Sequence, residues 1–294
     1  MRYTVRHETI YSYTDPVPIC HNRVHLVPRT TPYQACQGHE LEVYPKPISM
    51  TRRNDYFGNA TDYFSIQEAH EELRITANSV VEVIPREVPK AAKTAEWEQV
   101  AAGLRLDRSE QGLAIFHYSL PSPRIVPSDS LRIFAAESFS KRRPVFDGAR
   151  ELTQRVRPGF PFDPRATTVH TSPAEFFELR RGVCQDFAHF AVSCLRSIGL
   201  AARYVSGYVR TIPPNDGPRL VGADASHAWV SVYCGAAGWI DFDPTNDVLV
   251  GESHITIAWG RDYGDVGPIQ GVFVGGGEHT MHVGVDVAPL EAIA

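Results

Sequence analysis

Apolar and polar residues alternate in short runs over about the first 85 residues of the chain. The clearest runs are Tyr3–Arg6, Glu40–Tyr44, Leu73–Thr76 and Ser79–Val83. A period of two is typical of strands that bury one face. Turn-forming residues separate the runs, and the Phe57-Gly58-Asn59 triplet is suited to a hairpin connection. We therefore predict an antiparallel, β-rich domain over residues 1–90.

A stretch rich in proline and charge follows, and it interrupts regular structure often enough to connect two domains. Residues 91–104 and 128–139 nevertheless have helical composition, and Ser128-Asp129 is suited to cap the second of these helices. We predict a helical connection over residues 91–150. A second domain, with a C-terminal tail, is expected over residues 151–294.

The pattern changes to a helical one near residue 183. Apolar residues recur there at three- and four-residue steps, which is typical of a helix with one wide buried face, and Gly199 is suited to end it. The residues on that face are Val183, Phe187, Phe190, Ala191, Cys194, Leu195 and Ile198. Cys184 therefore lies in the first turn. Strands are predicted next over residues 202–210, 226–233 and 238–243, and a final strand over 278–287.

Composition is that of an ordinary folded protein. The 294 residues are 43% hydrophobic and 21% charged, close to the globular average and enough for two cores. A formal net charge of -5 gives no electrostatic reason to expect nucleic acid or a membrane surface as partner. The N-terminus lacks the apolar stretch of a signal peptide, so we expect a soluble, cytoplasmic protein.

Metal and disulfide chemistry are not favoured by the pattern. The five cysteines are odd in number, scattered and without a CxxC pair. Cys20, His21 and His25 are metal-ligand types, but strand alternation turns neighbours to opposite faces and no fourth ligand lies near. The Glu278–His282 segment does not match a helical HExxH motif. We predict no metal and no cofactor.

Cys184 is a candidate nucleophile. Free backbone N–H groups and the helix dipole stabilise a thiolate at a helix N-terminus, and Arg180-Arg181 adds positive charge. Gly182 is expected to let the chain turn sharply into the helix. A lone cysteine in such a place is more often structural, so partners have to decide its role.

His227 and Asp243 are the candidate partners. If the hairpin between their strands is symmetric about Gly235, both lie eight positions from its centre and stand opposite each other. Opposed Cβ atoms are about 4.5–5.5 Å apart, within reach of an imidazole–carboxylate hydrogen bond. Together with a thiol, this pair is the arrangement used for acyl transfer. The alternative is a half-exposed histidine and a solvated acid on a surface hairpin.

Three strings resemble the core motifs of the transglutaminase-like superfamily. They are Gly182-Val183-Cys184-Gln185-Asp186-Phe187-Ala188, Ser226-His227-Ala228-Trp229-Val230 and Gly238-Trp239-Ile240-Asp241-Phe242-Asp243-Pro244-Thr245. The resemblance implies Cys184 as nucleophile, His227 as base and Asp243 as the residue that orients it, with Asp241 as rival. Segments near both ends, among them Leu26–Arg29 and Gly260–Val266, resemble the bacterial branch with its β-rich N-terminal domain.

The resemblance implies an α+β protein whose second domain is papain-like, with the cysteine helix packed on an antiparallel sheet. It leaves the reaction open, because transglutaminases, proteases and amidases share the triad. We favour hydrolysis of a peptide, protein or small amide, since water is the default acceptor. The alternatives are a true transglutaminase with an amine acceptor and an inactive peptide-binding module. The sequence predicts no oligomeric state.

Other residues are expected to shape the site. The backbone N–H of Cys184 is expected to contribute to an oxyanion hole. Gln185, Asp186 and Trp239 are candidates for forming the surroundings of the thiol, although Gln185 and Asp186 are as well explained as helix-surface residues near a cap. The loop over residues 212–221 is a candidate wall or lid of the cleft.

Overall fold

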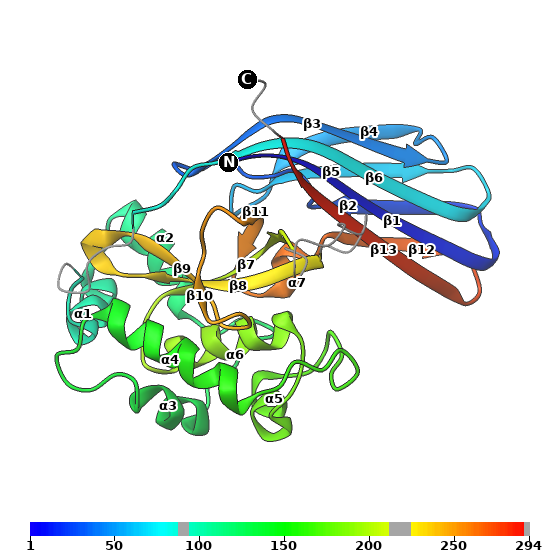
Figure 1. Cartoon of the computed structure of the whole chain (residues 1–294). Helices are drawn as coiled ribbons and strands as arrows, with labels where there is room; N and C mark the ends of the chain where they lie inside the picture. The colour runs from blue at the N-terminus through cyan, green and yellow to red at the C-terminus, as the bar shows by residue number, and fades with distance from the viewer. Residues whose placement is uncertain (88–93, 212–224, 291–294) are drawn as a thin grey trace, which may run out of the picture.

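The computed structural model of the chain describes residues 1–87, 94–211 and 225–290 and has an α+β fold (Figure 1). Its first part contains six strands: β1 (Arg2–Val17), β2 (Ile19–Val24), β3 (Gln34–Tyr44), β4 (Ser49–Asn54), β5 (Ala60–Ile66) and β6 (His70–Val83). The strand prediction for this region is confirmed. Burial alternates along β1, where Tyr3, Val5, His7 and Thr9 all turn to the interior.

Two antiparallel sheets form this β-rich part, with strand orders β13-β1-β6-β3 and β12-β2-β5-β4. The predicted hairpin is present, because Asn54 pairs with Ala60 and the Asp55 carboxylate accepts the N–H groups of Phe57 and Asn59 at 2.8 Å each. The last two strands of the chain, β12 (Ile269–Val274) and β13 (His279–Pro289), complete the two sheets. The tail thus returns to the N-terminal part.

Helices make up most of the middle of the chain. They are α1 (Trp97–Leu106), α2 (Glu110–Phe116) with a 3-10 turn η2 (His117–Ser119), α3 (Asp129–Ala136), α4 (Val145–Gly159), α5 (Pro173–Leu179) and α6 (Cys184–Ser197). The predicted cap of α3 is confirmed, since Ser128 Oγ accepts the N–H of Leu131 at 3.3 Å. The predicted cysteine helix is confirmed as α6, and Gly199 just beyond its end has a φ of 86°.

A five-stranded antiparallel sheet of order β10-β9-β8-β7-β11 packs against α6. Its strands are β7 (Ala202–Val209), β8 (Ala225–Tyr233), β9 (Trp239–Asp243), β10 (Val248–Leu249) and β11 (His254–Gly260), and the short helix α7 (Tyr263–Val266) follows. The three strands predicted here are confirmed. Buried aromatic and aliphatic residues of the helices and of β8 and β9 form one large core, including Phe187, Phe190, Val230 and Phe242.

The β8–β9 hairpin has a different register from the predicted one. Tyr233 pairs with Trp239, and Ser231 with Asp241, so the centre falls at residue 236 rather than at Gly235. The cause is a single 3-10 turn, η4 (Gly235–Ala237), closed by the Cys234 N–H donating to Gly238 O at 2.8 Å. The β9 partner of each β8 residue is therefore shifted by two positions, so each side chain stays on the predicted face of the sheet. His227 and Asp243 therefore share a face but are diagonal neighbours rather than opposed ones.

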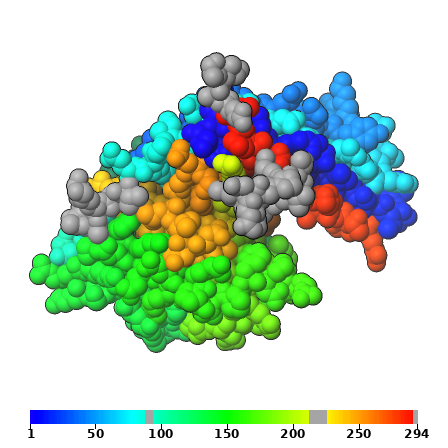
Figure 2. Space-filling view, in the orientation of Figure 1, coloured from blue at the N-terminus to red at the C-terminus, as the bar shows by residue number. Residues whose placement is uncertain are grey.

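The β-rich part packs directly on the five-stranded sheet. One apolar cluster joins Tyr3 and Val5 of β1 and Val285 of β13 to Tyr208 of β7 and Ile255 of β11. In Figure 2 the N-terminal and C-terminal strands lie together above the helical layer. The two parts thus share a buried interface. Of the helices in the described ranges, none has the length and apolar character needed to cross a bilayer.

Candidate active site

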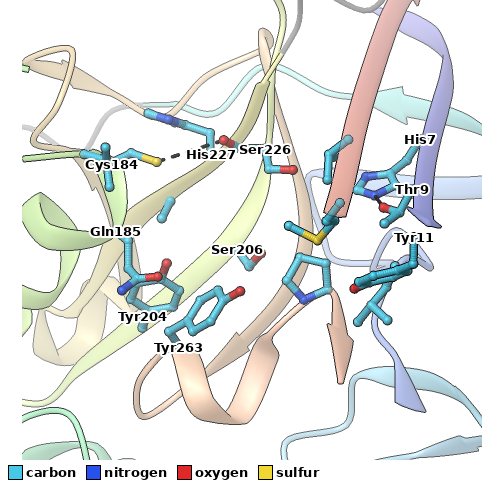
Figure 3. A pocket seen from close by; sticks show the side chains of 16 residues that line it. His7, Thr9, Tyr11, Cys184, Gln185, Tyr204, Ser206, Ser226, His227 and Tyr263 are labelled. Carbon is cyan, nitrogen blue, oxygen red and sulfur yellow. Dashed lines mark hydrogen bonds between the residues drawn. The ribbon is translucent and has the colours of Figure 1, made fainter. Parts of the chain in front are cut away.

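Cys184 is the first residue of α6, and its side chain is partly exposed at a cleft of about 280 Å³. Its sulfur lies 4.0 Å from the backbone oxygen of Ser226, so α6 brings the thiol against the start of β8 (Figure 3). The first-turn N–H groups of a helix have no partner within that helix. They and the helix dipole favour negative charge on a group in this place.

The turn into α6 is fixed by the Asp186 carboxylate. Its Oδ2 atom accepts the N–H of Val183 at 2.8 Å and the hydroxyl of Thr167 at 2.6 Å. Burial raises the pKa of Asp186, although these two bonds oppose the rise. A Cβ on Gly182 would lie 2.5 Å from Oδ2, so glycine is needed here for space rather than for the predicted sharp turn. The left-handed residue is Arg180, with a φ of 57°.

His227 and Asp243 are brought together as predicted, by a different register. The Nε2–H of His227 donates to Asp243 Oδ2 at 2.8 Å, and the carboxylate is fully buried. Nδ1 of the ring is thereby left for the thiol of Cys184, which lines the same cleft. Burial alone would lower the pKa of His227, but hydrogen bonds and charge interactions with Asp243 and Cys184 raise it to about 10.

Two further side chains hold Asp243, and neither was anticipated from the sequence. Asn246 Nδ2 donates to Oδ2 at 2.7 Å, and His254 Nε2 donates to the same oxygen at 3.2 Å. The backbone N–H groups of Thr245 and Asn246 donate to Oδ1 at 3.0 and 3.2 Å. Burial would raise the pKa of Asp243, but the bonds from His227, His254 and Asn246 hold it far below its usual range.

A substitution of His254 is expected to destabilise the fold through Asp243. With leucine at 254 the buried carboxylate loses one donor, and we expect the free energy of unfolding to fall by about 1–3 kcal/mol. Leucine retains an apolar contact with Trp229, whose ring lies 5.5 Å from that of His254. His254→Gln keeps a donor and should lose less than half as much. Urea unfolding at neutral pH measures both, and equal losses in the two variants would contradict the assignment.

Of the other residues predicted for the site, one lines the cleft and two have partners elsewhere. Gln185 lines the cleft, and its side chain donates to Val169 O at 3.3 Å. Trp239 does not line the cleft and instead packs on the Arg203 guanidinium, 3.8 Å from the ring centroid. The rival acid Asp241 forms an ion pair with Arg86 at 2.7 Å and is not bonded to His227. The predicted loop over 212–221 lies outside the described residues.

The residues of metal-ligand type in the N-terminal part have ordinary hydrogen-bond partners. Cys20 is 3.9 Å from His70 Nε2, and His25 bonds to Asp55 and to the Gly267 carbonyl. Across the described ranges, no group of three or more histidine, cysteine or acidic side chains is arranged to hold a metal ion.

The far wall of the cleft comes from the β-rich part (Figure 3). His7, Thr9 and Tyr11 of β1 face the thiol side across the cavity, and Met281 and Val283 of β13 also line it. Their alternation along paired strands places all five side chains on one face, because Thr9 pairs with Val283 and Tyr11 with Met281. The cleft therefore lies between the β-rich part and the core, with the thiol on one side and the N-terminal strand on the other.

Comparison with known proteins covers nearly the whole chain. Residues 133–244 match the model of the transglutaminase-like superfamily, and residues 3–82 match the bacterial transglutaminase-like N-terminal region. An uncharacterized protein of Mycobacterium tuberculosis is 39% identical over all of this chain and 94% of its own length. A protein-glutamine gamma-glutamyltransferase of Pseudomonas aeruginosa is 34% identical, but only over 29% of this chain and 13% of its own.

A solved structure has the same fold. It is described as that of a "Putative Cysteine Protease from Cytophaga hutchinsonii" and superimposes with a TM-score of 0.75 over 99% of this chain and 92% of its own, at 22% identity. That likeness shows that the fold is shared, and it extends over the strands at both ends of the chain.

Proposed function

Because the chain belongs to the transglutaminase-like superfamily, we propose that it is a thiol-dependent acyl-transfer enzyme that hydrolyses peptide or amide bonds. The observation that carries the proposal is the buried His227–Asp243 pair beside a thiol at a helix N-terminus. A histidine whose pKa is raised by both a carboxylate and a thiol is the partner that a reactive thiolate requires. Placed at a cleft wall, the sulfur is open to a substrate.

In the proposed acylation step, the Cys184 thiolate attacks the carbonyl carbon of the substrate amide and forms a C–S bond. The carbonyl oxygen becomes negatively charged, and the backbone N–H of Cys184 at the helix N-terminus donates to it. The C–N bond then breaks, and the amine leaves with the proton that His227 held on Nδ1. Asp243 keeps the ring oriented and stabilises its charged form.

In the deacylation step, His227 takes a proton from water, and the oxygen attacks the thioester carbonyl. The C–S bond breaks, the carboxylic acid leaves and the thiolate is restored.

An amine could replace water in the same step, and the local similarity to a gamma-glutamyltransferase favours that as the second candidate. Adding a fluorescent amine to the reaction distinguishes the two, since only the transferase would form a labelled amide.

Labelling with iodoacetamide at neutral pH tests whether the thiol is activated. Cys184 should react at least about tenfold faster than Cys36, because a helix N-terminus and a histidine stabilise its thiolate. Cys36 is a matched reference, since it is also partly exposed but lies on β3, and burial raises its pKa. The other three cysteines are buried. Mass spectrometry of the peptides gives both rates, and equal rates would remove the basis of the proposal.

A further inference from the structure

Three hydrogen-bonded side chains that the proposed reaction does not use run from the core to the wall of the cleft opposite Cys184. The Tyr208 hydroxyl lies 2.9 Å from His7 Nδ1, and His7 Nε2 lies 2.9 Å from Thr9 Oγ1. His7 and Thr9 are each 1% exposed and Tyr208 is 3% exposed. These hydrogen bonds join β7 of the core to β1 of the β-rich part, and the last of the three side chains, Thr9, lies at the cleft (Figure 3).

Both hydrogen bonds run in the same direction, with Tyr208 donating to His7 and His7 donating to Thr9. Burial lowers the pKa of His7 to about 4 and raises that of Tyr208, so both groups are neutral at neutral pH. Among the described residues the Tyr208 hydroxyl bonds only to His7, so its single proton is used by donating to Nδ1. A neutral imidazole that accepts at Nδ1 carries its proton on Nε2 and donates it to Thr9 Oγ1.

Thr9 is consequently left with a hydroxyl proton of its own to donate. Its oxygen already accepts from His7, and it has no other hydrogen-bond partner within the ranges that the structure describes. Thr9 lines the cleft, so a substrate there is the acceptor it faces. A buried hydroxyl without an acceptor costs free energy, and an acceptor supplied by a ligand recovers it.

The surroundings of Thr9 select against charge. None of the described residues that line the cleft is Asp, Glu, Lys or Arg. Burial raises the pKa values of Tyr11, Tyr204 and Tyr263, which keeps these phenols neutral. The remaining surface is largely apolar, with Ile269, Met281 and Val283 beside them. A charged group placed beside these neutral side chains of the far wall, away from the Cys184–His227 pair, would lose its hydration without gaining a counter-charge.

We propose that this wall is a substrate subsite in which Thr9 donates a hydrogen bond to a carbonyl oxygen of an uncharged peptide or amide segment. The inference rests on the proposed function, because the segment is the one attached to the acyl group that Cys184 attacks. Tyr208 and His7 act as positioning residues that fix the direction of the Thr9 hydroxyl. The N-terminal strand is thereby part of the binding site for the substrate.

Two thiol reagents of equal shape test the subsite. Iodoacetyl-Gly-Gly-amide ends in a neutral carboxamide and iodoacetyl-Gly-Gly in a carboxylate, and two residues reach about 7 Å beyond the first carbonyl. The full chain is treated with each, and the alkylation rate of Cys184 is divided by that of glutathione. We expect the amide to react about tenfold faster than the carboxylate at low reagent concentration. Cys36 should show no such preference.

Substitutions of Thr9 test whether its hydroxyl makes the proposed hydrogen bond. Thr9→Val removes the hydroxyl at constant shape and should weaken binding of the amide reagent about fivefold, without changing the limiting alkylation rate at saturation. Thr9→Ser should retain the wild-type value. Thr4→Val makes the same change on the opposite face of β1, where the hydroxyl lies 3.4 Å from Ala288 O, and should have no effect.

The outcomes separate the two proposals. If Cys184 reacts faster than Cys36 but does not distinguish the reagents, or if Thr9→Val binds the amide as well as Thr9→Ser does, the subsite is overturned and the enzyme proposal stands. If Cys184 reacts no faster than Cys36 with any reagent, the proposed function fails and the subsite fails with it. A preference for the amide that Thr9→Val weakens and Thr9→Ser keeps supports the subsite.

Discussion

Cys184→Ala is expected to abolish the burst of nitrophenolate that p-nitrophenyl acetate gives with a thiol enzyme. Loss of the attacking sulfur should lower the acylation rate by a factor of about 10⁴ or more, the scale seen when a catalytic nucleophile is removed. No other thiol can take its place within the described residues, since Cys20, Cys194 and Cys234 are buried and Cys36 is on β3. Stopped-flow absorbance with the wild type and the variant measures the burst.

The matched control for this substitution is Cys36→Ala, which removes the other partly exposed thiol. It should keep the full burst. Both variants should stay folded, with urea midpoints close to that of the wild type, because each change removes one small, partly exposed side chain. A Cys184→Ala variant that is folded and retains the burst would show that another group is acylated.

Asp243→Asn is expected to lower the acylation rate by a factor of about 10³–10⁴, because the imidazole loses the group that fixes its tautomer and stabilises its charge. The change also places an amide among five N–H donors from the backbone and from His227, Asn246 and His254. The rate of the burst measures the effect. A loss of less than about tenfold would contradict the role given to the carboxylate.

Asp243→Asn is also expected to shift the pH dependence of the acylation rate in a definite direction. In the wild type, Asp243 and Cys184 raise the pKa of His227 to about 10, so the imidazolium that accompanies the thiolate persists through neutral pH and is lost as the pH rises through that value. Asparagine removes the negative charge and should move this basic limb to lower pH. Asp241→Asn is the matched control, because Asp241 pairs with Arg86 and should leave the limb unchanged.

The elements around the site were predictable because their patterns are local. Alternating residues specify the faces of β8 and β9, and the apolar steps from Val183 specify α6 with Cys184 at its start. The register of the hairpin depends on the backbone conformation of Gly235–Ala237, which residue types alone leave undecided. His227 and Asp243 are still brought together, because a shift of two residues keeps side chains on the same face.

The environment of Asp243 was only partly predictable. An acid followed within three residues by turn formers commonly accepts their N–H groups, so the bonds from Thr245 and Asn246 had a local signal that could have been used. His254 had no such local signal, because it reaches Asp243 from β11, the edge strand that pairs with β7. Trp239 was misplaced because it shares a motif with Asp243, while its own ring packs on Arg203.

The far wall of the cleft is the part that sequence patterns could not supply. Both β1 and β13 were predictable as strands, yet their pairing joins residues near opposite ends of the chain, such as Thr9 and Val283. Nothing in the alternation of His7, Thr9 and Tyr11 distinguishes a buried strand face from one that lines a cleft. Contacts between the domains decide that question, and only the folded structure contains them.

The location of the acyl group is the most direct test of the central claim, that Cys184 attacks a carbonyl. The wild-type protein is mixed with p-nitrophenyl acetate, quenched in acid during the burst and digested for peptide mass spectrometry. The account predicts an acetyl group on Cys184 that hydroxylamine removes, as it does a thioester. An acetyl group found only on other side chains, with the Cys184 peptide unmodified throughout the burst, would contradict it.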